Sequence, residues 1–129
     1  KEVCSKEDLL VIVKEQVNLE NELSSKANKV LLLDTNIITT VNWSITHFDG
    51  YCDPWIIKQT ELLQYDHYLI TNIDIPWVKD DLRDRPNERE SMLSFLINQH
   101  DIRGLKYSII SGDIDERRSQ SIDIIKNLI

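Results

Sequence analysis

The sequence predicts an α/β fold in which a parallel sheet is flanked by helices. Short apolar segments, expected as strands, alternate along the chain with amphipathic segments that are expected as helices. Strands separated by helices favour parallel βαβ units, because the connecting helix packs back onto the sheet. With 129 residues, of which 41% are hydrophobic, the chain can bury a modest core. We therefore expect a single domain over residues 1–129.

The first helix is expected over about residues 6–26. Ser5 is a common N-cap residue, and Glu7 and Asp8 place acids in the first turn, where the helix dipole favours them. Apolar residues then recur at helical spacing. Further helices are expected over residues 39–48, 53–65, 87–101 and 114–129.

Two of these helices have an expected buried side. Pro54 favours the first helical position, and the same helix is expected to group its apolar residues on one side. Those residues are Ile56, Ile57, Leu62 and Leu63. In the helix over residues 87–101, the inward-facing residues are expected to be Met92, Leu93, Leu96 and Ile97.

Three strands are expected, over residues 28–36, 66–74 and 105–113, and each turns polar at its carboxyl end. The first is a continuous apolar run, which is typical of a strand covered on both faces. Ligands of open parallel sheets bind outside the carboxyl ends of the strands. Turn and helix-cap roles explain any one polar cluster equally well. The clusters are Asp34-Thr35-Asn36, Asn72-Ile73-Asp74 and Ser111-Gly112-Asp113.

The charge of the chain argues against a general role in binding nucleic acid or anionic membranes. The formal net charge is −7, whereas phosphate backbones attract basic surfaces. No apolar run approaches the length that spans a bilayer. The two cysteines, Cys4 and Cys52, lack zinc or redox spacing, so a reducing cytoplasm is the expected location.

Asp34 is the first candidate for chemistry, because it directly ends an apolar run. In enzymes that use nucleoside triphosphates, an acid at this position holds Mg²⁺ through water or orients the attacking hydroxyl. The alternative is that Asp34 caps the helix that begins near Ile37, a task that Thr35 or Asn36 could share.

The stretch over residues 72–89 mixes acids with arginines and contains Trp77 directly after a proline. Arg83, Arg85 and Arg89 supply forked donors that could stabilise the charge on a moving phosphoryl group. The alternative is that these arginines pair with neighbouring acids in solvent, where ion pairs contribute little.

Three segments resemble the ribosylnicotinamide (nicotinamide riboside) kinase domain of the NadR family, within the P-loop kinase superfamily. They read LLLDTNIITTVNWS, YDHYLITNIDIPWVKDDLRD and ERESM, and they occur in the family's order. The resemblance implies a three-layer αβα P-loop kinase-like fold. It also implies phosphoryl transfer from ATP, with Mg²⁺, to the 5′-hydroxyl of nicotinamide riboside in NAD biosynthesis.

The resemblance also implies roles for individual residues. Asp34 would act in catalysis and hold Mg²⁺ through water, and Asp34 and the arginines would line one cleft. Arg85 matches no family position, and Asp81 stands where a glycine is usual. Arg83 and Arg89 would belong to a lid, a segment that closes over the nucleotide, and would act in catalysis and bind ATP. The substrate would be bound by Thr35, Trp77 and Asp80. The adenine of ATP would be contacted by Ser111 and Gly112.

The phosphate-binding pattern Gly-x-x-x-x-Gly-Lys-Ser/Thr of such kinases is absent from the 129 residues. We therefore expect the chain to be the C-terminal part of one P-loop kinase-like domain, inactive alone. Two alternatives stay open: a non-catalytic regulatory or interaction module, and an ATPase of the same superfamily with another substrate. Expected partners are a nucleotide, a small-molecule substrate and the N-terminal part of the domain, with self-association left open. We expect no membrane or nucleic acid contact.

Overall fold

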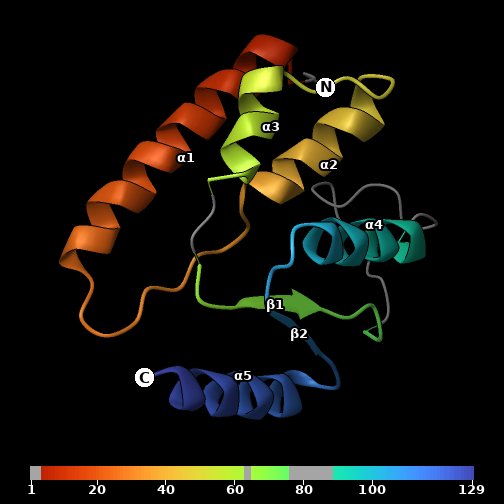
Figure 1. Ribbon diagram of the computed structural model, residues 1–129. Helices are drawn as coiled ribbons and strands as arrows, with labels where there is room; N and C mark the ends of the chain where they lie inside the picture. Colours follow the sequence, from red (N-terminus) through yellow and green to blue (C-terminus); the bar gives the residue numbers. More distant parts are fainter. Residues whose placement is uncertain (1–3, 63–64, 76–88) are drawn as a thin grey trace. The chain divides into compact units, whose positions relative to one another are not determined.

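The computed structural model describes residues 4–62, 65–75 and 89–129 (Figure 1). The chain divides into two compact units, one over residues 1–63 and the other over residues 64–129. Among the described residues, the first unit contains α1 (Lys6–Lys26), α2 (Ile37–His47) and α3 (Pro54–Thr60). The second contains β1 (Tyr68–Thr71), α4 (Arg89–Ile102), β2 (Tyr107–Ile110) and α5 (Ile114–Leu128).

Helix α1 begins and ends where the sequence predicts. Ser5 and Asp8 form a capping box: the Asp8 amide donates to Ser5 Oγ at 3.1 Å, and the Ser5 amide donates to Asp8 Oδ2 at 2.9 Å. The hydrogen bond from the Ser5 backbone holds the pKa of Asp8 below its ordinary value. The predicted N-terminus is therefore confirmed in its local detail.

The core of the first unit is formed where α1, α2 and α3 meet. Helix α1 contributes the buried residues Leu9 and Val13, and Val17 packs against the same core. Further along the helix, Leu19 and Leu23 are 54% and 37% exposed. The buried residues of this core are Leu9, Val13, Ile37, Val41, Cys52 and Ile56.

Helix α3 starts as predicted but is shorter. The Asp53 side chain caps it, accepting from the Trp55 amide at 2.8 Å, and Pro54 takes the first position. The helix ends at Thr60 rather than at residue 65. The prediction that Ile56, Ile57, Leu62 and Leu63 share one buried side is wrong. Ile56 is 1% exposed, whereas Ile57 is 40% and Leu62 is 62% exposed. Leu63 lies outside the described residues. Consecutive helical residues point about 100° apart, so only one of them faces the core.

The predicted strand over residues 28–36 is also corrected, because residues 30–33 form no strand. A strand exists only through hydrogen bonds to a neighbour, and the sheet of the described residues consists of β1 and β2. Leu32, in the middle of the apolar run, is 70% exposed. Apolar composition favoured a buried strand, but it could not provide a partner for one.

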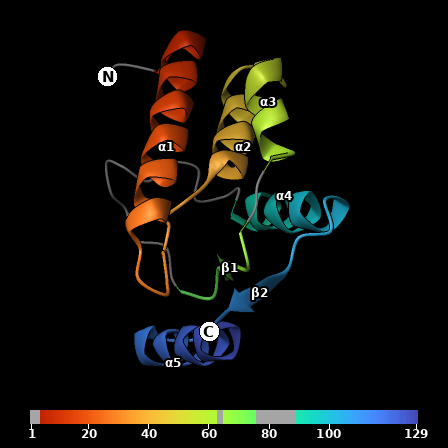
Figure 2. The same cartoon turned by 60° about the vertical axis from the view of Figure 1, so that its left-hand side comes forward.

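The second unit contains the predicted βαβ arrangement. Strands β1 and β2 pair in parallel, with Tyr68 opposite Tyr107, and α4 connects them. Figures 1 and 2 show α4 on one side of the strands and α5 on the other, which gives three layers. His100 of α4 lies against the sheet, with ring centroids 4.7 Å from Tyr68 and 5.8 Å from Tyr107. The predicted α/β class with a parallel sheet and flanking helices is confirmed.

Within the part of the chain that the structure describes, no helix is both long and apolar enough to cross a bilayer.

Ile56 and Ile57 offer a direct test of the core of the first unit. We expect Ile56→Ala to lower the free energy of unfolding by about 3 kcal/mol, because it leaves a cavity at a buried position. Ile57→Ala, its exposed neighbour, should cost less than about 1 kcal/mol. Urea unfolding of both variants measures the difference, and equal losses would contradict the assigned helix faces.

Candidate functional site

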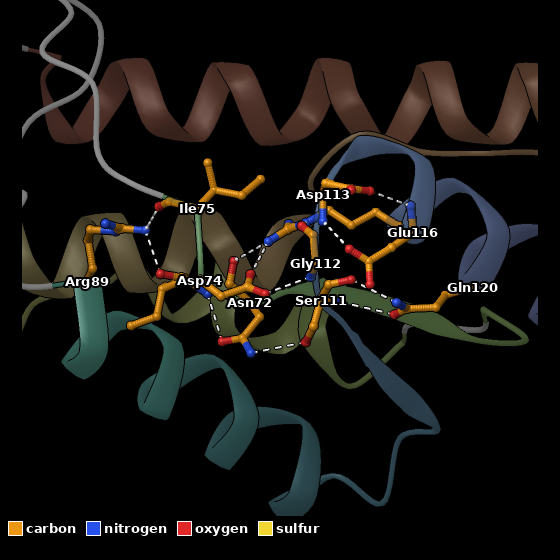
Figure 3. A network of polar contacts seen from close by, with 11 residues as sticks. Asn72, Asp74, Ile75, Arg89, Ser111, Gly112, Asp113, Glu116 and Gln120 are labelled. Atoms are coloured by element: carbon orange, nitrogen blue, oxygen red, sulfur yellow. Dashed lines mark hydrogen bonds and ion pairs between the residues drawn. The ribbon is translucent and has the colours of Figure 1, made fainter.

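Two of the predicted polar clusters meet at the carboxyl ends of β1 and β2 (Figure 3). The strands are parallel and adjacent, so their ends lie at the same edge of the sheet. Asn72 directly follows β1, and its amide donates to the Ile110 carbonyl at 2.8 Å. Its side-chain Nδ2 donates to Ser111 Oγ at 3.0 Å. The turn after one strand is thus tied to the end of the other.

The main chain of Gly112 is hydrogen-bonded to two side chains of this network, those of Asp74 and Arg117. Its amide donates to Asp74 Oδ2 at 2.6 Å, and its carbonyl accepts from Arg117 Nε at 2.7 Å. Arg117 Nη2 also forms an ion pair with Asp74 Oδ1. We name this closed ring of Asp74, Gly112 and Arg117 the Gly112 clamp. It joins the segment after β1, the turn after β2 and the first turns of α5.

A glycine is required at the centre of the clamp. Gly112 has φ +96°, a left-handed conformation that residues with a Cβ rarely adopt. A Cβ there would also lie 2.9 Å from three side-chain atoms of Glu116. Glu116 has little room to move, because it forms a capping box with Asp113 at the start of α5.

The clamp changes the acidity of Asp74. The amide of Gly112 and, more weakly, the charge of Arg117 favour the ionised carboxylate, and together they hold the pKa of Asp74 below its ordinary value. Asp74 therefore remains charged at neutral pH and accepts both hydrogen bonds.

Gln120 holds the neighbouring residue Ser111 in the same way. The Ser111 amide donates to Gln120 Oε1 at 3.0 Å, and Gln120 Nε2 donates to the Ser111 carbonyl at 2.7 Å. Side chains of α5 therefore orient two successive residues of the turn, Ser111 and Gly112, for which the resemblance to NadR-family kinases implies contact with adenine.

Arg89 is the first residue of α4, and its guanidinium contacts the segment after β1. Arg89 Nη2 donates to the carbonyl oxygens of Ile73 at 2.8 Å and Ile75 at 2.5 Å. In the structure Arg89 therefore fixes the path of the chain beyond β1, and its predicted catalytic and ATP-binding role stays a prediction. The other predicted site residues of this stretch, Trp77, Asp80 and Arg83, lie outside the described residues, as do Asp81 and Arg85.

Asp34 and Thr35 belong to the first unit and line a hollow of about 240 Å³. Leucines of α1 and of the preceding apolar run form much of its wall, with Gln16 and Glu20 beside them. Thr35 has φ +63°, which is unusual for a β-branched residue. Asn36 caps α2, accepting from the amides of Ile38 and Thr39. The capping alternative considered for this cluster is therefore realised by Asn36.

The described residues suit Mg²⁺ only through water-mediated contact, and they do not form a complete set of protein ligands. They contain no cluster of three or more His, Cys, Asp or Glu side chains that could hold a metal ion. Mg²⁺ in nucleotide enzymes keeps several waters and is held by one or two carboxylates together with substrate phosphates. The exposed carboxylate of Asp34 suits such water-mediated contact. Asp34 and Arg89 lie in different units, so their predicted common cleft stays a prediction.

Comparison with protein families identifies the family of the chain. Residues 1–117 match the family described as AAA domain, which is most of the chain. The chain belongs to the AAA domain family. Its members are P-loop NTPase-like proteins, so the indicated activity is nucleotide binding with hydrolysis or phosphoryl transfer, with no particular substrate specified. Searches of curated proteins and of solved structures gave no match.

Sequence reasoning missed two residues that shape this site, Arg117 and Gln120. Both lie in α5, for which the sequence predicts a helix over residues 114–129 and no site residue. A signal was present: side chains in the first turns of a helix point back toward its N-terminus, and α5 begins just after the turn at Ser111 and Gly112. Polar residues at those positions could therefore reach the turn.

Gly112 provides the first test of the site. We expect Gly112→Ala to lower the free energy of unfolding of the unit over residues 64–129 by about 2 kcal/mol or more, because the new Cβ adds a clash to backbone strain. Gly104→Ala is the matched control: its φ is +65° and an added Cβ would meet nothing within 4 Å. The control should cost about 1 kcal/mol, from the left-handed conformation alone. Equal costs in urea unfolding would refute the crowding at Gly112.

The pKa of Asp74 predicts the pH dependence of this unit. Its folded pKa lies below the ordinary 3.8, so the ionised carboxylate stabilises the fold above that value. The contribution is lost as pH falls from about 4 toward the folded pKa. We expect Asp74→Asn to be less stable than the unchanged chain at pH 7 and nearly equal to it at the acid end. Urea unfolding as a function of pH measures both, and a constant difference would count against the assigned ionisation.

Proposed function

We propose that the chain is the C-terminal part of an ATP-dependent kinase domain that phosphorylates the 5′-hydroxyl of nicotinamide riboside. Membership of the AAA domain family supports a nucleotide substrate. The observation that carries the proposal is the meeting of the Asn72–Asp74 and Ser111–Asp113 clusters at the carboxyl ends of adjacent parallel strands, where ligands of such sheets bind. The choice of nicotinamide riboside rests on the resemblance of the quoted segments to NadR-family kinases.

In this proposal, Asp34 accepts a hydrogen bond from the substrate hydroxyl and orients it for attack on the γ-phosphate. Thr35, Trp77 and Asp80 bind the substrate beside it. Mg²⁺ bound with ATP supplies positive charge against the phosphate oxygens, and the carboxylate of Asp34 would hold that ion through water. Cytoplasmic location and a reducing environment are part of the same proposal.

The arginines stabilise the negative charge of the transferring group. Forked guanidinium donors suit the phosphoryl oxygens, and Arg83 and Arg89 are proposed for that role. Arg89 also fixes the carbonyls of Ile73 and Ile75, so it would couple the segment after β1 to the nucleotide. Ser111 and Gly112 contact the adenine. The phosphate-binding loop, whose pattern the 129 residues lack, would come from the N-terminal part of the same domain.

A phosphoryl-transfer assay tests the proposal in the full-length protein that carries these residues. With ATP, Mg²⁺ and nicotinamide riboside we expect product formation. We expect Asp34→Asn to lower kcat by about 100-fold or more, because the neutral amide cannot take the hydroxyl proton as a carboxylate does. Asp49→Asn is the control, since Asp49 is also an exposed acid of the first unit. It should change kcat by no more than about twofold.

The outcomes separate the parts of the proposal. No turnover of nicotinamide riboside by the full-length protein would remove the substrate. Unchanged turnover in Asp34→Asn would remove Asp34 from the mechanism. ATP hydrolysis that does not depend on nicotinamide riboside would favour the ATPase alternative.

A non-catalytic regulatory or interaction module is the second candidate. One observation favours it: the main-chain amides and carbonyls of Ser111 and Gly112 are already hydrogen-bonded to side chains of the protein. These are the two residues proposed to contact adenine. Absence of ATP binding by the full-length protein would support this candidate over the kinase.

A further inference from the structure

Arg117 is the most buried arginine of the α5 helix and has no role in the activity proposed above. Its side chain is 14% exposed, whereas that of the next residue, Arg118, is 68% exposed. Among the described residues, Arg118 forms an ion pair with Asp115 of its own helix, at 4.0 Å. The two neighbouring arginines therefore have different surroundings, although the sequence gives them no distinction.

Arg117 connects segments that are far apart in the sequence. Its guanidinium donates to the Gly112 carbonyl at 2.7 Å and to the Asn72 carbonyl at 3.2 Å, and it pairs with Asp74. Asn72 and Asp74 follow β1, whereas Gly112 follows β2. One planar group thus spans the ends of both strands, a geometry that suits the fixed fork of arginine and not a lysine ammonium.

The ring of contacts leaves the Gly112 peptide little freedom. Asp74 accepts the Gly112 amide hydrogen, Arg117 donates to the Gly112 carbonyl, and Asp74 and Arg117 are paired with each other. A glycine alone would sample many conformations, because it lacks a Cβ. The charged hydrogen bonds of the clamp are among the stronger ones in proteins, and they select one conformation.

We infer that Arg117 is a positioning residue for the nucleotide base: through the Gly112 clamp it fixes the turn that contacts adenine. This inference rests on the proposed function, in which Ser111 and Gly112 contact the base. Arg117 itself touches neither base nor phosphate. Its loss should weaken the binding of the adenosine part of ATP and spare the binding of the phosphate chain.

Two measurements on Arg117→Gln and the control Arg118→Gln test this. The first is hydrogen exchange of the Gly112 amide in the 129-residue chain. It should become about tenfold faster in Arg117→Gln, because the Gly112 carbonyl loses its charged donor and Asp74, the acceptor of the amide, loses its ion pair. The second uses the full-length protein with a fluorescent ATP analogue, displaced by Mg-ATP or by inorganic tripolyphosphate.

The ratio of the two affinities is the decisive quantity. We expect Arg117→Gln to weaken Mg-ATP about tenfold while tripolyphosphate changes by less than about twofold, because only the base contacts depend on the turn. Arg118→Gln should alter neither affinity nor the exchange rate. General destabilisation of the fold would weaken both ligands alike.

Each contrary result has a distinct meaning. If the unchanged protein binds Mg-ATP and Arg117→Gln binds it equally well, the inference is wrong while the proposed function stands. An equal loss of Mg-ATP and tripolyphosphate would make Arg117 a structural residue only and would also overturn the inference. Failure of the unchanged protein to bind either ligand would overturn the proposed function, and the inference with it.

Discussion

The parallel pairing of β1 with β2 is the constraint on which the candidate site depends. Because the strands run in the same direction in fixed register, the polar residues that follow each of them lie at one edge of the sheet. Their contacts then become possible across long stretches of sequence: Asp74 and Arg117 are 43 positions apart and form an ion pair. Without this pairing, nothing in the sequence would bring Asn72 close to Ser111 and Gly112.

The α5 helix gives the turn its rigidity. Arg117 and Gln120 reach back from its first turns and hold the peptide groups of Gly112 and Ser111. The capping box of Asp113 and Glu116 fixes where the helix begins, and Glu116 fills the space beside Gly112. One short helix segment therefore determines its own start and the conformation of the residues before it. Such a turn is organised before any ligand arrives, which lowers the cost of binding.

What the sequence could predict follows from how local each interaction is. The start of α1 after its N-cap Ser5 and the start of α3 at Pro54 depend on neighbouring residues, and both were predicted correctly. The strand over residues 28–36 was predicted from composition, but a strand needs a distant partner, and none pairs with it among the described residues. For the clamp, helix geometry indicates that polar residues early in α5 could reach the turn. Which of the adjacent Arg117 and Arg118 does so depends on how the helix packs against the strand ends.

Some features of the candidate site could likewise be predicted from the sequence, and others could not. The sequence correctly grouped Asn72, Asp74, Ser111 and Gly112 at strand ends, since apolar runs mark where strands stop. It did not show that the main-chain groups of Ser111 and Gly112 are held by α5, because that depends on how the helix packs. Family membership supports a nucleotide as one substrate. The identity of the phosphate acceptor depends on particular side chains of the site and not on the fold, so an activity assay decides it.

The central proposal is that the turn at Gly112, at the carboxyl ends of β1 and β2, binds the base of a nucleotide. NMR titration of the full-length protein tests it most directly, by following the backbone amide of Gly112 with Mg-ATP and with inorganic tripolyphosphate. The account predicts that Mg-ATP shifts this signal and that tripolyphosphate, which has no base, leaves it nearly unchanged. No shift with Mg-ATP, or an equal shift with both ligands, would contradict a base-binding turn.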